Sequence, residues 1–414
     1  MPAFLIKGGG AFVPNLEGEI AVGSSKNASL PALASSLLFS DTPRFLNLPE
    51  IEDIKRMNEL ISSVDSEGKA DLDIAKRFRA SILVVGPLLA RFGKASFPHP
   101  GGCLIGARPI DVFINGWEAM GGKLAECGKT DGGNLIYTVE ATGWLTGCDY
   151  TFKVQSVTGT EGMIMTALLA KGDTALRNCA MEPEIEYLAD FLNKNGADIR
   201  GAGTTEITVA GRSGKLLRTA SPFLAPSDRI EAGTFLILGA LAARSLEIKN
   251  INKRELASLF AALGEAGVEI IETKNGILIK KPKKINPVNI KTKEYPGFAT
   301  DLQAPFSVLA TQASGQSLIH ETIFEGRLAY TEDLNRMGAK VTLMDPHRAL
   351  ITGSTPLYGR ELTSPDLRAG LAYVIAALIA EGESKIGNIY QIDRGYEKID
   401  ERLRAIGADI DRIN

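Results

Sequence analysis

The segment Leu334-Asn-Arg-Met-Gly-Ala-Lys-Val341 contains the pattern that decides the fold, because the chain repeats it. Nearly the same order of residues occurs in Leu192-Asn-Lys-Asn-Gly-Ala-Asp-Ile199, Leu263-Gly-Glu-Ala-Gly-Val-Glu-Ile270 and Leu403-Arg-Ala-Ile-Gly-Ala-Asp-Ile410. Each copy predicts a helix that ends at Gly and is followed by a strand, since glycine takes the positive φ of a helix C-cap without steric cost. Boundaries of this kind also arise by chance, but four near-identical copies favour a true repeat.

A second pattern recurs with a related period: an Ala- and Leu-rich helix, a turn, a short β-like run and a polar or Asn-containing bend. It occupies residues 33–47, 88–101, 168–178, 241–250, 309–321 and 378–388, at intervals of 51, 80, 73, 70 and 67 residues. Six units that alternate helix and strand predict an α/β protein built by internal duplication. The short first interval predicts that the first unit has lost a strand pair and has a surface loop at 62–71.

Length and composition fit a soluble protein of several domains. A chain of 414 residues is too long for one ordinary core and fits roughly two or three domains. Its apolar runs reach about a dozen residues, below the ~20 that a membrane-spanning helix needs. The 46 basic and 49 acidic residues leave a formal charge of −3, so no electrostatic footprint for nucleic acid is present. Residues 1–7 lack the basic n-region and long apolar h-region of a signal peptide, so we expect a cytoplasmic protein.

Cysteines and histidines are few and are not arranged as metal ligands. The four cysteines are Cys103, Cys127, Cys148 and Cys179, and the three histidines are His99, His320 and His347. None of the cysteines form a CxxC pair, and the histidines lack HExxH spacing. We therefore expect no disulfide framework and no metal, and a Ser-His-Asp hydrolase would have to use one of these three histidines.

One cysteine lies in an unusual loop, Pro100-Gly-Gly-Cys-Leu-Ile-Gly-Ala-Arg-Pro109. Three glycines and two prolines predict an exposed, tightly bent segment. Because positive charge favours a thiolate, Cys103 near Arg108 is a candidate reactive thiol. A small buried cysteine in a turn is the alternative interpretation.

Cationic residues lie at several predicted element boundaries. Lys26 and Asn27 stand just before a predicted helix at 28–39 and follow Ser24-Ser25, a good N-cap pair. A lysine at a helix N-terminus suits an anionic ligand, although a solvated lysine is the ordinary case. Further boundary arginines, each of which could simply pair with a carboxylate, are Arg79, Arg91, Arg108, Arg327, Arg368 and Arg394.

Asp301 has a different setting. It lies between the Pro- and Gly-rich turn at 295–300 and an apolar helix predicted from Leu302. Thr300 or Asp301 could be the N-cap of that helix, or a partly desolvated Asp301 could act as a general base. Phosphate-binding loops of the common kinds are absent, because Lys123 occupies a glycine position in the nearest match, 122–130.

Taken together, these segments resemble the UDP-N-acetylglucosamine enolpyruvyl transferase family over nearly the whole chain. The most specific matches are the segments 25–28, 79–81, 101–109, 182–184, 228–234, 300–301, 322–327, 366–368 and 393–397. The resemblance implies a two-domain inside-out α/β barrel of six βαβ-type units, three per domain. It also implies a discontinuous catalytic domain formed by 1–22 plus 227–414, and an inserted domain, 23–226, that carries the Cys103 loop.

The resemblance assigns roles to individual residues. Cys103 matches the general acid that protonates C3 of phosphoenolpyruvate, can form a covalent adduct with it and is alkylated by fosfomycin. Asp301 matches the carboxylate that takes the proton from the sugar 3′-hydroxyl. Cations around the phosphate match Lys26, Arg108 and Arg394, and those near the substrate carboxylate match Arg327 and Arg368. Residues that match contacts to the UDP-sugar or support for the phosphate site are Asn27, Arg79, Asp111, Ser156, Val157 and Ile323.

The implied activity is transfer of the enolpyruvyl group from phosphoenolpyruvate to the 3′-hydroxyl of UDP-N-acetylglucosamine, with release of phosphate. This reaction is the first committed step of peptidoglycan synthesis, which links the protein to the cell wall, cell shape and cell division. The implied partners are these two small molecules, with no cofactor, metal, nucleic acid or membrane. A monomer is expected and an oligomer stays open. Joining Cys103 and Asp301 from different domains requires closure on binding.

Some positions depart from the family pattern. Phe113 and Tyr330 stand where many members have His, and Lys55 follows Asp53 where another acid is frequent. Two alternatives therefore stay open. One is the shikimate-pathway transferase, 5-enolpyruvylshikimate-3-phosphate synthase, against which Cys103 argues because that enzyme lacks the cysteine loop. The other is a catalytically silent paralogue that binds UDP-sugar, against which retention of Cys103 and Asp301 argues.

Overall fold

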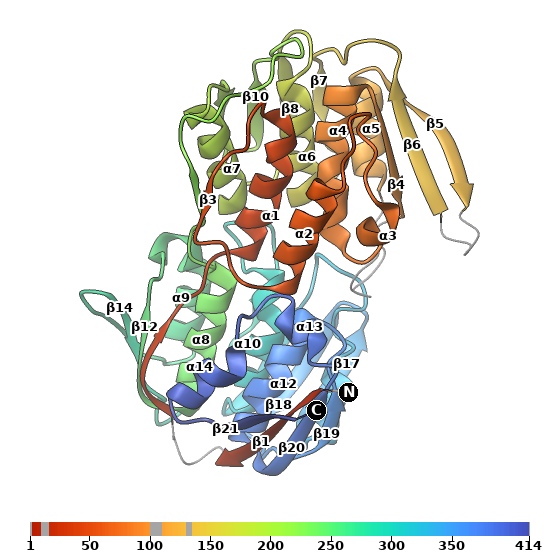
Figure 1. The fold of residues 1–414 in the computed structure, drawn as a ribbon. Helices are drawn as coiled ribbons and strands as arrows, with labels where there is room; N and C mark the ends of the chain where they lie inside the picture. Colours follow the sequence, from red (N-terminus) through yellow and green to blue (C-terminus); the bar gives the residue numbers. More distant parts are fainter. Residues whose placement is uncertain (1, 10–15, 100–109, 130–134, 414) are drawn as a thin grey trace. The chain divides into compact units, whose positions relative to one another are not determined.

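The computed structural model describes residues 2–9, 16–99, 110–129 and 135–413, with only the backbone described at 126, 127 and 129 (Figure 1). The chain divides into two compact units. Over the described residues, unit 1 is built from the N-terminal segment up to Gly23 and from Ser227 onward, and unit 2 from the chain between them.

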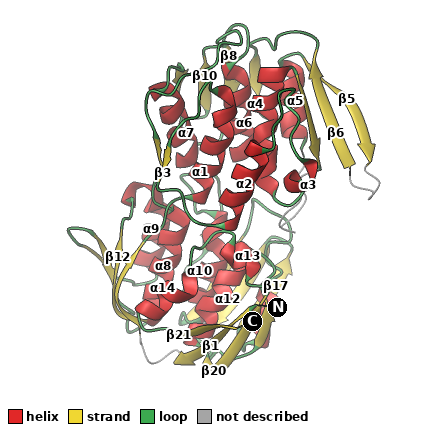
Figure 2. Ribbon diagram, in the orientation of Figure 1, coloured by secondary structure: helices red, strands yellow, loops and turns green. Residues whose placement is uncertain are grey.

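Unit 1 contains three four-stranded sheets among its described residues, ordered β19-β20-β1-β21, β13-β14-β12-β2 and β15-β16-β18-β17. Figure 2 shows strands of this unit in yellow and its helices in red. The strands are β1 (Ala3–Gly9), β2 (Leu16–Ala21), β12 (Ala243–Lys249), β13 (Ile270–Glu272), β14 (Gly276–Ile279), β15 (Ile290–Lys291), β16 (Gly315–His320), β17 (Lys340–Asp345), β18 (Arg348–Gly353), β19 (Glu361–Thr363), β20 (Glu381–Gly387) and β21 (Asp409–Ile413). In the first sheet β1 lies between β20 and β21 and is antiparallel to both.

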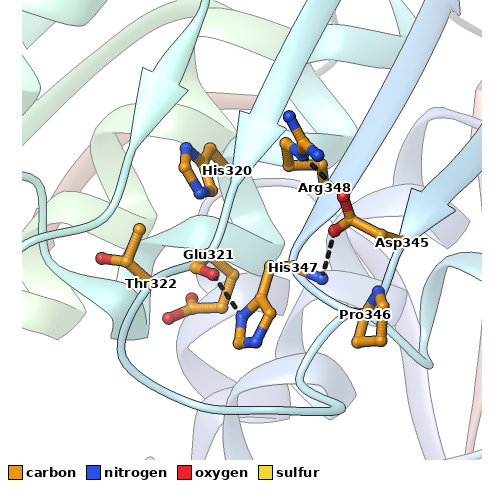
Figure 3. Close-up of a pocket in the computed structure, with 7 residues that line it drawn as sticks. All are labelled: His320, Glu321, Thr322, Asp345, Pro346, His347 and Arg348. Atoms are coloured by element: carbon orange, nitrogen blue, oxygen red, sulfur yellow. Dashed lines mark hydrogen bonds and ion pairs between the residues drawn. The ribbon is translucent and has the colours of Figure 1, made fainter.

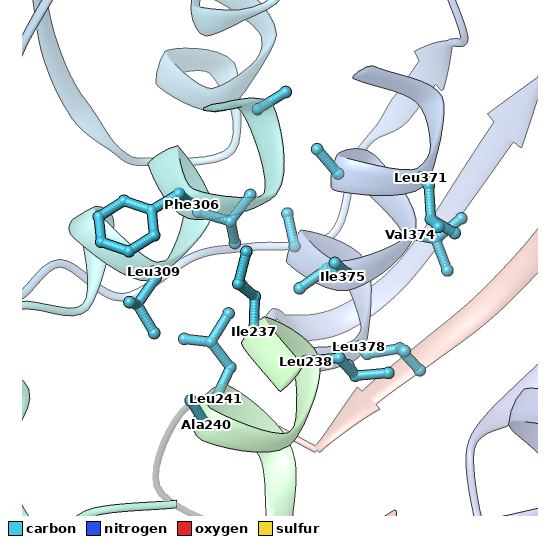
Figure 4. Close-up of a cluster of buried hydrophobic side chains, with 14 of the residues drawn as sticks. Ile237, Leu238, Ala240, Leu241, Phe306, Leu309, Leu371, Val374, Ile375 and Leu378 are labelled. Atoms are coloured by element: carbon cyan, nitrogen blue, oxygen red, sulfur yellow. The ribbon is translucent and has the colours of Figure 1, made fainter. Parts of the chain in front are cut away.

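Three buried helices form the core of unit 1. The helices of this unit are α8 (Arg229–Ala242), α9 (Ala257–Glu265), α10 (Gln303–Thr311), α11 (Thr331–Arg336), α12 (Leu367–Ile379), α13 (Tyr390–Asp393) and α14 (Ile399–Ala405). Helices α8, α10 and α12 pack against one another, and each also packs on one sheet. Figure 4 shows their hydrophobic side chains meeting, with Ile237 and Leu241 from α8, Phe306 from α10 and Ile375 from α12. A helix that is apolar all round belongs in a protein interior, so the helices are central and the sheets cover them.

Unit 2 also contains three sheets among its described residues, with four, three and two strands, ordered β7-β8-β10-β9, β4-β6-β5 and β11-β3. The strands are β3 (Phe45–Leu46), β4 (Lys94–Pro98), β5 (Gly122–Lys129), β6 (Leu135–Ala141), β7 (Asp149–Thr151), β8 (Thr174–Arg177), β9 (Ile199–Arg200), β10 (Glu206–Val209) and β11 (Phe223–Leu224). The helices are α1 (Lys26–Ala34), α2 (Glu52–Ser62), α3 (Leu72–Ala75), α4 (Val85–Phe92), α5 (Asp111–Ala119), α6 (Val157–Leu168) and α7 (Pro183–Lys194).

The predicted alternation of helix and strand is confirmed. Parallel strand pairs flank a buried helix in β7-α6-β8, β15-α10-β16 and β19-α12-β20, while β2 and β12 pair in parallel around α8 with unit 2 inserted between them. A parallel pair needs such a crossover, and a helix is its usual form. The shortened first unit is also visible, because β3 belongs to a two-stranded sheet and residues 63–71 form a loop.

The repeat closures have the predicted conformation. Gly196, Gly267, Gly338 and Gly407 follow α7, α9, α11 and α14 with φ of 97°, 82°, 111° and 97°. These values lie in the left-handed region that glycine adopts without strain. The four sequence copies therefore mark four equivalent helix ends.

The Asn-containing bends form a second set of equivalent positions. Asn47, Asn178, Asn250 and Asn388 all have positive φ, between 54° and 59°. The corresponding residue of the fifth unit is Glu321, which ends the 309–321 segment and does not share this conformation.

Two local expectations need correction. Helix α1 spans Lys26–Ala34 and is continued by a 3₁₀ turn at Ser35–Leu38, so Lys26 is its first residue and does not precede it. A 3₁₀ turn at Thr300–Leu302 leads into α10, and neither Thr300 nor Asp301 caps a helix with its side chain. Within the described ranges, no helix combines the length and the apolar character that crossing a membrane requires.

Candidate functional site

In unit 1, Asp301 lies between two buried arginines. Its Oδ1 is 2.8 Å from Nη2 of Arg327, and its Oδ2 is 3.0 Å from Nε of Arg368. The Asp301 side chain is 25% exposed, whereas those of Arg327 and Arg368 are 4% and 5% exposed. The carboxylate therefore reaches the surface while both of its cationic partners are held inside the unit.

Helix α12 and the residues after α13 fix the position of Arg368. Asp366 caps α12 by accepting N–H bonds from Arg368 at 2.7 Å and from Ala369 at 3.0 Å. Nη1 of Arg368 donates to Oη of Tyr396 at 2.9 Å, and the guanidinium lies 5.4 Å from the centre of that ring. Burial lowers the pKa of Arg368, but Tyr396 and Asp301 outweigh this effect and the net pKa is raised, so Arg368 remains a cation.

Arg327 is held by residues on its other side. Nη1 of Arg327 donates to Oγ1 of Thr300 at 2.9 Å, and Oγ1 of Thr300 donates to Oε2 of Glu321 at 2.7 Å. The guanidinium also lies 5.3 Å from the ring centre of Phe324. Glu321 is fully buried and accepts the N–H of Ile323 at 2.8 Å. The sequence assigned no role to Glu321; the signal that could have found it is that it replaces Asn in the internal repeat.

The last predicted site residue of unit 1, Arg394, follows α13 as its C-cap. It is half-buried, and its Nη1 donates to Oε1 of Gln391 at 3.0 Å. The side chain is thus held against its own helix.

A shallow pocket of about 450 Å³ lies beside this network on unit 1. Figure 3 shows its lining residues, which are His320, Glu321, Thr322, Asp345, Pro346, His347 and Arg348. Nδ1 of His347 donates to the backbone carbonyl of Glu321 at 2.9 Å, and Nε of Arg348 pairs with Asp345 at 2.6 Å. None of the predicted site residues line this pocket, and Glu321 is the residue that it shares with the Asp301 network.

In unit 2, the predicted residues lie where helices begin. Oγ of Ser25 caps α1 by accepting the N–H of Ala28 at 3.2 Å, and Lys26 and Asn27 are the first two residues of that helix. Nζ of Lys26 is 3.5 Å from Oδ2 of Asp53, and the two side chains are 13% and 5% exposed. A helix N-terminus has positive potential, which the Lys26 ammonium increases.

Two further helix starts in unit 2 are adjacent. Asp111 is the first residue of α5, and Ser156 caps α6 by accepting the N–H of Gly159 at 3.1 Å, so that Val157 begins the helix. A Cβ on Gly159 would lie 3.0 Å from the side chain of Val112, which shows how closely α5 approaches α6 there. Arg79 is likewise a first residue, of the 3₁₀ helix Arg79–Val84.

Two of the positions that depart from the family pattern, Phe113 and Tyr330, are core residues. Phe113 is buried, with its ring 5.8 Å from that of Trp117 and close to Gly162 of α6. Tyr330 is buried and donates from Oη to Oγ of Ser307 at 2.7 Å, and burial raises its pKa. Both replacements therefore contribute to packing.

Cys103 and Arg108 lie outside the described residues, so their predicted roles remain predictions. Cys148 is half-buried and Cys179 is buried, and neither is in a disulfide. Burial raises the pKa of both thiols, that of Cys179 to about 12, which disfavours the reactive thiolate. In the described part of the chain no three His, Cys, Asp or Glu side chains are grouped as metal ligands would be.

Comparison with known proteins gives consistent results. The sequence model of the EPSP synthase (3-phosphoshikimate 1-carboxyvinyltransferase) family matches residues 13–403. The UDP-N-acetylglucosamine 1-carboxyvinyltransferase of Campylobacter hominis is 42% identical over 99% of both chains. That of Myxococcus xanthus is 40% identical over 100% of this chain and 99% of its own length.

Solved structures show the same fold. The enolpyruvyl transferase NikO from Streptomyces tendae has a TM-score of 0.88 at 22% identity, covering 99% of this chain and 98% of its own. EPSP synthase from Acinetobacter baumannii has a TM-score of 0.70 at 19% identity over 100% of both chains.

Proposed function

The chain belongs to the UDP-N-acetylglucosamine 1-carboxyvinyltransferases within the enolpyruvyl transferase family, and from this we propose that it transfers the enolpyruvyl group of phosphoenolpyruvate to the 3′-hydroxyl of UDP-N-acetylglucosamine, releasing phosphate. The observation that carries the proposal is the partly exposed Asp301 carboxylate held between the buried Arg327 and Arg368. Addition of a hydroxyl to C2 of an enol phosphate needs a base at the hydroxyl, and an anionic substrate needs cations beside it.

We assign the base to Asp301. Its two oxygens accept N–H bonds from Arg327 and Arg368, and the side chain is 25% exposed, so a substrate hydroxyl can approach the carboxylate. The two arginines fix the plane of the carboxylate because they bind different oxygens. Nε and Nη1 of Arg368 are used by Asp301 and Tyr396, so its Nη2 is the group that we assign to the substrate carboxylate.

We assign the remaining steps to residues that the family pattern identifies. Cys103 is the proposed acid at C3 of phosphoenolpyruvate and the residue alkylated by fosfomycin. The phosphate is proposed to contact Lys26, Arg108 and Arg394. The proposed contacts of the UDP-sugar and its supporting groups are Asn27, Arg79, Asp111, Ser156, Val157 and Ile323. The helix starts described in unit 2 support these assignments, since N-terminal N–H groups bind phosphates.

The finer description of the fold is part of the proposal. We propose an inside-out α/β barrel of six βαβ-type units, three in each domain, with 1–22 plus 227–414 as the catalytic domain and 23–226 as the insertion. The buried helices and the three sheets of each unit, counted over the described residues, support it. We further propose a cytoplasmic protein whose reaction begins peptidoglycan synthesis and thereby serves the cell wall, cell shape and cell division.

The experiment is an assay of phosphate release from phosphoenolpyruvate with either UDP-N-acetylglucosamine or shikimate 3-phosphate as acceptor. We expect release that depends strictly on UDP-N-acetylglucosamine. Equal phosphate release with shikimate 3-phosphate would show that the assignment of UDP-N-acetylglucosamine as the acceptor is wrong. Binding of UDP-N-acetylglucosamine without phosphate release in the presence of either acceptor would identify a catalytically silent paralogue.

A variant of the proposed acid completes this test. Cys103→Ser is expected to lose most turnover while UDP-N-acetylglucosamine still raises its melting temperature, because the acid is removed and the sugar contacts remain. Fosfomycin should inactivate the wild-type protein and leave no adduct on the variant. An unchanged turnover in Cys103→Ser would remove the cysteine from the mechanism.

A further inference from the structure

The internal repeat shows what the residue at the position of Glu321 does elsewhere in the chain. Asn178 donates from Nδ2 to the backbone carbonyl of Phe152 at 2.8 Å. Asn250 donates in the same way to Val22 at 3.0 Å, and Asn388 to Ser364 at 2.8 Å. In each of these three units the Asn side-chain amide thus links the bend after one strand to the residue that follows the neighbouring parallel strand. This role is structural and needs a side-chain donor.

Glu321 cannot fill that role, because an ionised carboxylate only accepts hydrogen bonds. The strand pairing just before it is nevertheless equivalent, since Thr292 donates its N–H to the carbonyl of His320 at 2.9 Å just as Phe152 does to that of Arg177 at 3.0 Å. The residue itself differs, because Glu321 lacks the positive φ of those Asn residues. The carbonyl of Thr292 is satisfied by Oγ1 of Thr322 at 2.5 Å. The hydrogen bond that Asn donates to the neighbouring strand in the other units is therefore donated here by the next residue, Thr322. Glu321 is not needed for this link.

The Glu321 carboxylate instead collects four hydrogen bonds. Its Oε1 accepts from Oγ1 of Thr292 at 3.0 Å, from the N–H of Ile323 at 2.8 Å and from that of Phe324 at 3.2 Å. Its Oε2 accepts from Oγ1 of Thr300 at 2.7 Å. A fully buried carboxylate is costly unless it is hydrogen-bonded, and this one is satisfied on both oxygens.

The bond to Thr300 has a direction that matters for Asp301. Because the Thr300 hydroxyl gives its only hydrogen to Glu321, its oxygen presents lone pairs to Nη1 of Arg327, which donates at 2.9 Å. Arg327 is then fixed at one nitrogen, and its Nη2 is directed at Oδ1 of Asp301 at 2.8 Å. A chain of hydrogen bonds therefore runs from Glu321 through Thr300 and Arg327 to Asp301, and we call it the polarity chain.

We propose that Glu321 is a positioning residue of the transferase reaction: it orients Arg327 and Asp301 through Thr300 and fixes the backbone N–H groups of Ile323 and Phe324. The backbone of Glu321 is held by His347 at the pocket of Figure 3: its N–H donates to the His347 carbonyl at 2.8 Å, and its carbonyl accepts from Nδ1 of His347 at 2.9 Å. Main chain and side chain are thus both held. The proposal rests on the function assigned above to Asp301.

The decisive variant is Glu321→Asn, which restores the residue of the other repeats. We expect its melting temperature to fall by only a few degrees, since the Asn side-chain oxygen can still accept part of the hydrogen bonds that Glu321 accepts and the position does not have a positive φ. We expect kcat to fall about 10- to 100-fold, because misplacing a catalytic group by about 1 Å has effects of that size. Full kcat in a folded Glu321→Asn protein would overturn the proposal.

Variants of Thr300 separate the polarity chain from simple packing. Thr300→Val removes the hydroxyl and should lower kcat to about the level of Glu321→Asn, while Thr300→Ser keeps it and should recover most of the wild-type kcat. The double variant Glu321→Asn with Thr300→Val should be no slower than either single variant, because both break the same chain. Additive losses, or a Thr300→Ser protein as slow as Thr300→Val, would show that no such chain operates.

A matched control is Asn250→Asp at the equivalent position of another unit. It removes the donor to Val22 without touching the Asp301 network, so the melting temperature should fall while kcat stays within about twofold of wild type. A kcat loss equal to that of Glu321→Asn would mean that any disturbed bend slows the enzyme and would overturn the proposal. Wild-type protein in the same assay distinguishes failure of the proposed transferase function from failure of the positioning role of Glu321. If the wild type released no phosphate, the proposed function itself would be refuted.

Discussion

The two units hold their predicted site residues in different ways. In unit 1, Asp301, Arg327 and Arg368 bind one another, and buried groups fix the arginines from behind. In unit 2, Lys26 and Asp111 stand at the first position of a helix, where the backbone itself supplies positive potential. The comparison teaches that a change in unit 1 should alter stability and chemistry together, whereas a change in unit 2 should act mainly on ligand affinity.

Buried carboxylates show a second contrast. Glu321 in unit 1 is satisfied on both oxygens, but Oε1 of Glu161 in unit 2 has no hydrogen-bond partner in the described structure. Burial, followed by the nearby Glu184 and Glu182, raises the pKa of Glu161 well above its usual value. A buried acid with a raised pKa lowers the free energy of unfolding by an amount that depends on pH.

The largest effect is expected from Asp301→Asn. Loss of the proposed base should lower kcat about 10²- to 10⁴-fold, the range that general acid–base catalysis contributes. Two buried guanidiniums would also lose their charged partner, so the melting temperature should fall. Phosphate release and calorimetry on the same samples test both parts, with Asp400→Asn, a buried carboxylate that pairs with Arg412, as the control for stability alone. Lost activity at unchanged stability would break the stated contrast between the units.

Arg368→Lys is expected to have the next largest effect. Lysine keeps the charge but cannot direct separate N–H groups at Asp301 and Tyr396. Loss of one hydrogen bond to a charged group is worth about 1.5–3 kcal/mol, so kcat/KM for phosphoenolpyruvate should fall roughly 10- to 150-fold. Steady-state kinetics with varied phosphoenolpyruvate measure it, and a lysine variant with wild-type kcat/KM would mean that charge alone is needed.

In unit 2, Lys26→Gln should raise the KM for phosphoenolpyruvate about tenfold, because one cation of the proposed phosphate site is removed. The melting temperature should fall less than in Asp301→Asn, since the Lys26–Asp53 distance of 3.5 Å is longer than the 2.8 Å between Asp301 and Arg327. Lys26→Arg should recover part of the affinity. A stability loss equal to that of Asp301→Asn would show that unit 2 is as tightly interlocked as unit 1.

The smallest effect, on stability alone, is expected from Glu161→Gln. Because the pKa of Glu161 is higher in the folded protein than its usual 4.5, the folded state keeps a proton that the unfolded state has lost. Wild-type stability should therefore decrease as pH rises above about 4.5, and the uncharged Gln should abolish that component. At pH 8 a gain of about 1 kcal/mol would raise the melting temperature roughly 2–4 °C.

Melting curves from pH 5 to pH 8 check this sign. The variant and the wild type should differ least at pH 5 and most at pH 8. A difference that shrinks as pH rises would mean that Glu161 is stabilised as an anion in the folded state.

The sequence predicted the features that depend on local sterics. Gly196 and Gly338 close helices because their φ is one that other residues avoid, and that requirement is visible in the residue type itself. The loop at 63–71 followed in the same way from a polar run and a short repeat interval. Starts of helices were less accurate, since Lys26 could equally precede or begin α1.

The pairing of the candidate site residues could not be predicted, because it depends on tertiary geometry. Asp301 and Arg368 are 67 residues apart, and nothing in either segment indicates that they meet. Asp301 also remained ambiguous between a helix cap and a base until the 3₁₀ turn showed that it caps nothing. Glu321 was overlooked because its role depends on Thr300 and Arg327, although its substitution for Asn in the repeat was visible.

The position of β1 between β20 and β21 has a consequence for synthesis on the ribosome. Roughly 400 residues separate β1 from β21, so at about 5–20 residues per second the first strand waits some 20–80 s for its last neighbour. The chain of unit 2 is complete long before then. We therefore expect the inserted unit to reach its native state while the nascent N-terminal strand is still awaiting its sheet.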